Sequence, residues 1–157
     1  MLRKYLLIFL ISMVPLVELR GAIPTAVTMG LDYWTSLAVC ALGNMLPVPI
    51  IYFFARKVLV WGADKKYIGK FFRYCLEKGE KGGQKLKEKT GRGGLFVALL
   101  LFVGIPLPGT GAWTGTLAAS FLNMGIKSTA LAVSLGVVLA GIIMGVGSHT
   151  ALAMFGF

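Results

Sequence analysis

Hydrophobic positions along the chain gather in four long blocks instead of alternating with polar positions. The blocks cover residues 5–31, 35–61, 95–126 and 128–155. A transmembrane helix needs about 20 consecutive apolar residues, so each block is long enough to enter a membrane. The pattern predicts an all-α integral membrane protein.

The second and fourth blocks predict plain spanning helices. Residues 35–61 end near Arg56 and Trp61, residue types that suit a cytoplasmic membrane interface. We expect Pro47 and Pro49 to kink this helix, since neither has a backbone N–H to donate.

The fourth block carries Gly141 and Gly145 in a GxxxG arrangement, which predicts a small-residue face for close helix packing. We interpret His149, near the end of this block, as an interface residue. Asp32, Tyr33 and Trp34 are interpreted as an interfacial turn.

The first and third blocks are interrupted in the middle, by "PLVELRGAIP" (15–24) and by "GIPLPGTGAWTG" (104–115). Proline and clustered glycine disfavour a continuous helix. Non-helical backbone at membrane depth needs protein or a water-filled cavity around it. Both blocks are therefore expected to form re-entrant hairpins inside the molecule. The expected hairpin-break residues are Pro15, Pro24, Pro106, Pro108, Gly109 and Gly111.

An internal repeat supports this plan. "MGLDYWTSLAVCALG" (29–43) resembles "MGIKSTALAVSLG" (124–136), and each follows a broken block and opens a plain one. A re-entrant hairpin plus one spanning helix crosses the membrane an odd number of times, so two such units have opposite orientation. We predict a single membrane domain, 1–157, with repeat one at 1–61 and repeat two at 95–157.

The segment between the repeats, residues 62–94, holds ten Lys or Arg and four Asp or Glu, a net charge of +6. The positive-inside rule makes it a cytoplasmic loop, and anionic lipid headgroups are a better match for this charge than nucleic acid. With the loop inside, Lys127 also falls inside, whereas Arg3 and Lys4 fall outside. A spanning first block would place those two inside, so both models of block 5–31 stay open.

Composition agrees with a multi-pass protein of the cell membrane. Of the 157 residues 57% are hydrophobic, and only 14% are charged, against about 25% in soluble domains. Cys40 and Cys75 lie in different segments without metal-ligand spacing, and we interpret both as ordinary residues. The basic, then apolar N-terminus resembles a signal peptide, but Glu18 and Arg20 interrupt its apolar run, so we expect it to be retained.

Glu18 and Arg20 are the only charges between Tyr5 and Leu31. A charge at bilayer depth costs at least about 2.5–3.5 kcal/mol on insertion scales, and such residues usually mark a pathway. Arginine suits a phosphate because of its planar fork, and Glu18 is a candidate proton carrier. The alternative is a structural ion pair between the two.

The second break offers uncharged polar groups. A helix beginning after Gly111 would point its positive end into the site, which suits an anion. The predicted substrate-binding residues are Glu18, Arg20, Asn44, Thr110, Trp113 and Thr114. No catalytic triad, HExxH or phosphate-binding glycine motif occurs in the sequence, so we expect neither enzyme chemistry, nor a metal, nor a cofactor.

The two broken stretches, "PLVELRGAIP" and "GIPLPGTGAWTGTLAA", resemble the motifs of the small multidrug export protein family over most of the chain. The hairpin plan is also similar to the wider DedA superfamily, which is associated with moving undecaprenyl phosphate or phospholipids. That resemblance implies an acid in the first hairpin, matched by Glu18, and arginines in the second hairpin, which this sequence lacks.

We therefore expect a transporter or flippase for an anionic amphiphile such as undecaprenyl phosphate or another lipid phosphate. Two alternatives stay open: an exporter of lipophilic cations with Glu18 as the binding carboxylate, and a non-transporting membrane scaffold. Because four short elements bury little surface, a homodimer or higher homo-oligomer is expected.

Overall fold

The computed structural model describes residues 1–15 and 17–155, and the side chains of these except at residues 75, 79, 80, 82, 83, 86, 87, 152 and 155. Over this range the fold is helical and contains no strand. The helices are α1 (Leu2–Met13), α2 (Glu18–Thr28), α3 (Tyr33–Met45), α4 (Pro47–Ala63), α5 (Gly69–Gly104), α6 (Ala112–Phe121) and α7 (Ile126–Phe155).

The first block forms a helical hairpin, in which α1 and α2 pack against each other and against α3. The open end of this hairpin lies at the lower end of the molecule, where Lys4 Nζ donates a hydrogen bond to the Met29 carbonyl at 3.0 Å. Pro15 lies in the turn between the helices, as predicted. Pro24 does not break the chain: it lies inside α2. The actual break falls before Glu18, so the prediction for Pro24 was wrong.

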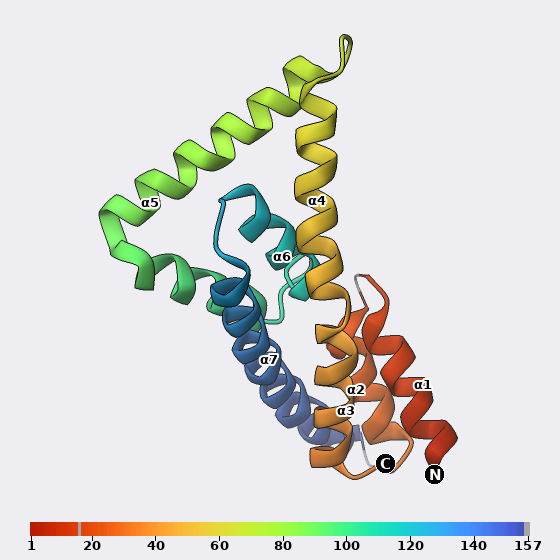
Figure 1. Ribbon diagram of the computed structural model, residues 1–157. Coiled ribbons are helices and arrows are strands. Elements are labelled where there is room, and N and C mark those ends of the chain that lie inside the picture. The colour runs from red at the N-terminus through yellow and green to blue at the C-terminus, as the bar shows by residue number, and fades with distance from the viewer. Residues whose placement is uncertain (16, 156–157) are drawn as a thin grey trace.

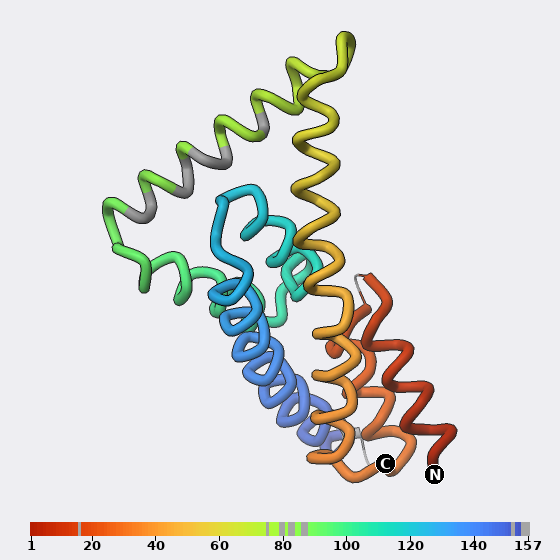
Figure 2. Tube along the Cα trace, in the orientation of Figure 1, coloured from red at the N-terminus to blue at the C-terminus, as the bar shows by residue number. Residues whose placement is uncertain are grey.

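The second block forms α3 and α4, which together make an apolar span from Tyr33 to Ala63. The interruption is a single residue, Leu46, whose φ of −61° and ψ of −41° are helical. The two helices therefore continue along one path (Figure 2). Pro47 opens α4 at a position where a missing N–H is tolerated, so the expected kink is reduced to this one-residue interruption.

Most of the basic segment is helical: after a turn at residues 64–68, α5 begins at Gly69. α5 departs from the bundle, bends sharply and returns to it (Figures 1 and 2). Gly91 makes the bend with a φ of +70°, a conformation that glycine adopts without steric penalty. The returning part of α5 and α6 form the second hairpin.

The fourth block forms α7, which packs on α5, α2 and α3 and is the second apolar span, Ile126–Ala151. A Cβ added to Gly141 would collide with Leu37, and one added to Gly145 would collide with Tyr33. The predicted small-residue face is thus confirmed, and it packs against α3. His149 is exposed, with its ring 6.1 Å from that of Tyr33.

The second helices of the two hairpins share an unusual backbone geometry. α2 starts at Glu18 (φ +50°) and is followed by Gly30 (φ +66°); α6 is preceded by Gly111 (φ +141°) and followed by Asn123 (φ +55°). The members of each pair are twelve positions apart in the sequence. The same capping bond closes both helices, from the Leu31 and Met124 N–H groups to the carbonyls five residues earlier.

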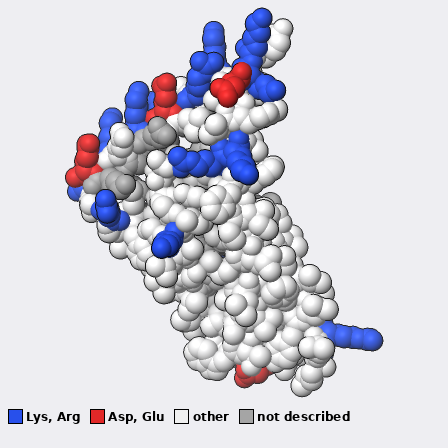
Figure 3. Space-filling view, in the orientation of Figure 1, with Lys and Arg blue, Asp and Glu red and all other residues white. Residues whose placement is uncertain are grey.

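Lys and Arg gather over α5 and the adjoining end of α4, whereas the middle of the visible face carries few charges (Figure 3). At the opposite end, Asp32 orders the turn before α3: its carboxylate accepts hydrogen bonds from the Thr35 N–H (2.8 Å) and hydroxyl (2.6 Å). Cys40 is buried and unpaired; the Cys75 side chain lies outside the described ones.

Candidate functional site: a clamp between two hairpins

Glu18 reaches from the first hairpin to the start of the second hairpin's helix. Its side chain is only 4% exposed. Oε2 accepts a hydrogen bond from the Ala112 N–H at 3.1 Å, and Oε1 accepts one from the Trp113 N–H at 3.0 Å. The first N–H groups of a helix have no intrahelical acceptor, and the helix dipole favours negative charge there. α6 therefore begins with an anion-binding site, and Glu18 occupies it.

Gly111 makes this contact possible. Its φ of +141° is unfavourable for other residues, and a Cβ at this position would collide with the Glu18 carboxylate. Glu18 itself has a φ of +50°, which is uncommon for a residue other than glycine. Such a conformation persists only where the surroundings hold it, and the two hydrogen bonds to α6 do so.

Arg20, two residues further along the first turn of α2, binds the same broken segment. Its guanidinium donates hydrogen bonds to the Leu107 carbonyl, to the Ile105 carbonyl at 3.3 Å and to the Thr110 hydroxyl oxygen at 2.5 Å. A longer contact of 3.5 Å reaches the Val103 carbonyl. The Thr110 hydroxyl lies within bonding distance of the Leu107 carbonyl, at 2.9 Å. Arg20 therefore donates hydrogen bonds to backbone carbonyls between α5 and α6 that are not bonded within a helix.

The two charged residues do not form a salt bridge with each other. In the part of the chain that the structure describes, the recorded ion pair is Lys81–Glu77, on α5. Glu18 binds N–H groups at the start of α6, while Arg20 binds carbonyls before it. The alternative of an ion pair within the hairpin tip was wrong. We call the Glu18 and Arg20 contacts with residues 103–113 the hairpin clamp.

The structure brings most of the predicted site residues to the clamp. Thr110 is bound by Arg20, and Trp113 is bound through its backbone. Thr114, in the first turn of α6, makes a 3.5 Å contact from its hydroxyl to the Gly111 carbonyl. Pro106, Pro108 and Gly109 lie in the non-helical stretch between α5 and α6.

Asn44 is not joined to the clamp by any recorded hydrogen bond among the described residues. It lies on α3 with a side chain 2% exposed, and its Oδ1 has no recorded partner. The sequence shows a polar residue in an apolar block, but it does not show on which side of the helix that residue lies.

An apolar groove of about 320 Å³ adjoins the clamp. It lies between α4 and α6, with Phe72 from α5, and its lining side chains are all apolar. Trp113 belongs to both features, since its N–H binds Glu18 and its side chain lines the groove. A polar anion site and an apolar groove thus lie next to each other.

Sequence reasoning missed the residues that fix the second hairpin against α4. Tyr52 donates a hydrogen bond from its hydroxyl to the Met124 carbonyl, and Ser120 donates to the Tyr52 carbonyl at 3.2 Å. Arg56 donates to the Asn123 side chain. Of these residues, only Asn123 could have been recognised from the sequence. Asparagine is one of the few residues that adopt the left-handed conformation at the end of a helix, and Asn123 does so with a φ of +55°. No cluster of three metal-ligating side chains occurs among the described residues.

Comparison with known proteins gives one match. A family model described as "Putative small multi-drug export protein" matches residues 18–143, from Glu18 of the clamp into α7. No curated protein and no solved structure matches the chain. The match covers well over half of the sequence and confirms the family resemblance, so the chain belongs to this membrane export protein family.

Proposed function

We propose that this protein is a transporter that moves an anionic amphiphile, such as undecaprenyl phosphate or another lipid phosphate, through the hairpin clamp. One observation carries the proposal: two N–H groups at the start of α6 hold a buried carboxylate. A carboxylate and a phosphate use the same kind of site at a helix N-terminus. Glu18 then occupies the place that the substrate takes.

Protonation of Glu18 is the step that exchanges the two anions. A neutral carboxyl group accepts hydrogen bonds more weakly than a carboxylate. Its release would free the Ala112 and Trp113 N–H groups for the substrate's phosphate, with Arg20 close by to provide positive charge. Transport would then be coupled to protons, and the groove beside Trp113 would take part of the hydrocarbon chain.

Helix lengths support re-entrant hairpins. At 1.5 Å per residue, α1 with 12 residues and α2 with 11 residues extend roughly 18 and 17 Å, and the hydrocarbon core is about 30 Å thick. α6, with 10 residues, extends roughly 15 Å. The matching caps of α2 and α6 support the inverted repeat.

Cysteine labelling tests this topology in a background without native cysteines. Lys81→Cys and Lys127→Cys should react with a membrane-impermeant reagent from the cytoplasmic side, and Asp32→Cys from the opposite side. Labelling of Lys127→Cys and Lys81→Cys from opposite sides would contradict a re-entrant second hairpin.

Transport itself is tested in proteoliposomes with a fluorescent lipid phosphate and, separately, a lipophilic quaternary ammonium ion. We expect proton-dependent movement of the phosphate, its loss in Glu18→Gln and Arg20→Lys, and wild-type rates in the control Arg3→Lys. Arg20→Lys keeps the charge but loses the planar fork.

The family description favours a second candidate, an exporter of lipophilic cations that uses Glu18 as its carboxylate. Under this alternative the cation is transported, and binding of the cation improves when Arg20 is removed. That result would replace the anion proposal.

A further inference from the structure

The first part of α5, residues 69–90, follows the end of a membrane span and then leaves the bundle. The span Tyr33–Ala63 ends a few residues before α5 begins. At its start the helix is fixed to α4, because a Cβ added to Gly62 would collide with the Phe72 ring. From there to the bend at Gly91 the helix extends away from the other helices (Figure 1). We call residues 69–90 the surface helix.

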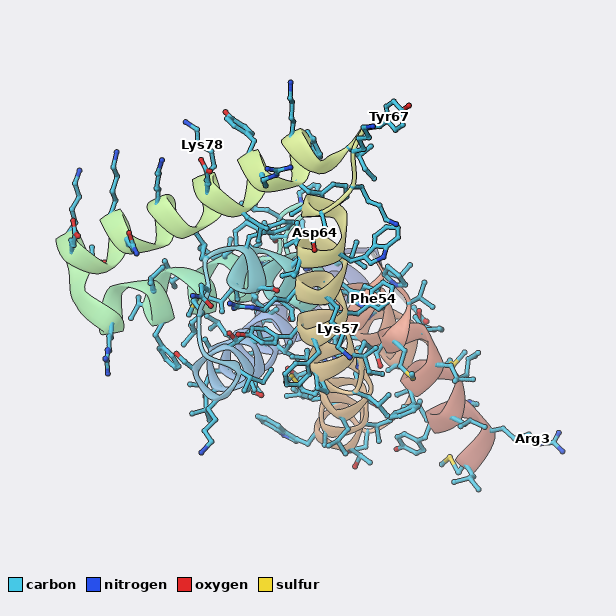
Figure 4. The ribbon with its side chains drawn as sticks, turned by 45° about the horizontal axis from the view of Figure 1, so that its top comes forward. Arg3, Phe54, Lys57, Asp64, Tyr67 and Lys78 are labelled. Carbon is cyan, nitrogen blue, oxygen red and sulfur yellow. The ribbon has the colours of Figure 1, made fainter. Side chains whose placement is uncertain are left out.

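The surface helix has a basic face. Lys78, Lys81 and Lys85 are three and four residues apart, the spacing that keeps side chains on one side of a helix. These three lysines line one surface depression together with Tyr74 and an acidic residue, Glu77. Figure 4 shows Lys78 pointing away from the rest of the molecule. Phe72 and Leu76, by contrast, are only partly exposed.

Aromatic side chains accompany these lysines. Tyr67 is 96% exposed, Phe71 66% and Tyr74 59%, and Tyr67 extends outward beside the start of the helix (Figure 4). Lys78 Nζ lies 5.6 Å from the Tyr74 ring centre. Exposed aromatic rings among lysines are typical of helices that lie in the membrane–water interface.

The charge of this region is not balanced within the described residues. The recorded ion pair, Lys81–Glu77 at 4.0 Å, is 71% and 69% exposed and is therefore weak. Residues 62–94 keep a net charge of +6. Clusters of Lys and Arg directly after a membrane span are attracted to anionic lipid headgroups.

We propose that the surface helix lies in the cytoplasmic interface of the membrane and binds anionic lipid headgroups through Lys78, Lys81 and Lys85. The partner is a phosphate-bearing lipid of the bilayer and not a nucleic acid, because the helix directly follows an apolar span and exposes aromatic rings beside its lysines. This site is separate from the hairpin clamp and does not depend on the proposed transport function.

Lipid binding by the full-length protein tests this proposal. Purified protein in neutral detergent is titrated with short-chain phosphatidylglycerol and, in parallel, with short-chain phosphatidylcholine. We expect saturable binding of phosphatidylglycerol that weakens with salt. Since each lysine near an anionic surface contributes about fivefold, the triple variant Lys78/Lys81/Lys85→Gln should lose about a hundredfold in affinity.

A matched control removes the same charge elsewhere, with Arg3, Lys57 and Lys127 changed to Gln. Its affinity should stay within about fivefold of wild type. Equal binding of both lipids, or equal losses in the two triple variants, would overturn the proposal. So would a single-stranded RNA or an acidic peptide that competes the lipid off at lower concentration. Circular dichroism of each variant confirms that the helices remain folded.

Discussion

The hairpin clamp and the surface helix use charge in opposite ways. At the clamp, Glu18 and Arg20 lie in an otherwise apolar region, and each is held by several backbone groups. Residues 62–94, which contain the surface helix, have a net charge of +6. Among the described side chains there, the ion pair is the exposed Lys81–Glu77. Charged groups inside the protein need partners at fixed positions, whereas charged groups at the surface can exchange theirs. We therefore expect large effects of substitution at the clamp and small ones on the surface helix.

Gly111→Ala should have the largest effect. The substitution places a Cβ on the Glu18 carboxylate and strains a backbone with a φ of +141°. Displacing a buried charge from its partners costs about 3–5 kcal/mol, and we expect a fall of that order in the free energy of unfolding in detergent. The control Gly147→Ala, where a Cβ meets no atom within 4 Å, should be neutral or stabilising by up to about 1 kcal/mol. If the two variants are equally stable, the Glu18 carboxylate can move aside at little cost, and the proposed importance of the hairpin clamp for stability is contradicted.

Glu18→Gln should cause the second-largest decrease in the free energy of unfolding. Two carboxylate oxygens accept from the Ala112 and Trp113 N–H groups, whereas glutamine has one acceptor oxygen and an amide group that opposes the second N–H. A hydrogen bond to a charged group contributes about 1.5–3 kcal/mol, so the loss of one predicts a decrease of that size. Asp32→Asn is the matched control, because asparagine caps a helix as well as aspartate does. A decrease as large in the control would contradict the assignment.

Arg20→Lys should destabilise by about 1–2 kcal/mol. Lysine cannot bond the Leu107 and Ile105 carbonyls and the Thr110 hydroxyl in one plane, as the guanidinium does. Thermal unfolding compared with the exposed Arg3→Lys measures this. If both changes are equally small, the charge of Arg20 matters and its geometry does not.

Asp32 gives a smaller, pH-dependent effect. The hydrogen bonds from the Thr35 hydroxyl and N–H lower the pKa of Asp32 below its usual range. A carboxyl group with a lowered folded-state pKa stabilises the protein above its unfolded-state pKa, and this contribution is lost as the pH falls through the folded-state value. The thermal midpoint of wild type should therefore fall more steeply in acid than that of Asp32→Asn. Parallel curves would contradict this role.

Lys81→Gln should have the smallest effect on stability, about 0.3 kcal/mol, because it removes only an exposed i, i+4 pair with Glu77. A loss above about 1 kcal/mol would mean that the surface helix depends on its charges to fold, and the contrast between the two regions would fail.

The sequence predicted plain apolar helices in blocks two and four and a helix start after Gly111. The structure has two helical stretches long and apolar enough to span a membrane, and α6 begins at Ala112. The four-block pattern depends on local composition, and a glycine beside helix-forming residues is also a local signal. The sequence did not predict the partners of Glu18 and Arg20. These partners are backbone N–H and carbonyl groups, which every residue has, so no residue type marks them.

Pro24 and the surface helix show a second limit. Proline disfavours a helix interior, but tertiary packing of α2 against α1, α3 and α7 outweighs this preference. The glycine-rich and lysine-rich stretch 69–90 has a poor hydrophobic pattern, yet it is helical. In both places the helix propensity of the residues is a weak guide. Packing against other helices, or exposure to solvent, determines whether the segment is helical.

The most direct test of the anion exchange at α6 is nuclear magnetic resonance of the Ala112 and Trp113 amides while the full-length protein is titrated with a lipid phosphate. We predict that both amide resonances shift on binding, with higher affinity at acidic pH, and that Glu18→Gln removes this pH dependence. Gly147 amide resonances should stay unchanged. If the lipid phosphate is transported while the two amide resonances do not shift, the substrate does not replace Glu18. The hairpin clamp would then only hold the two hairpins together.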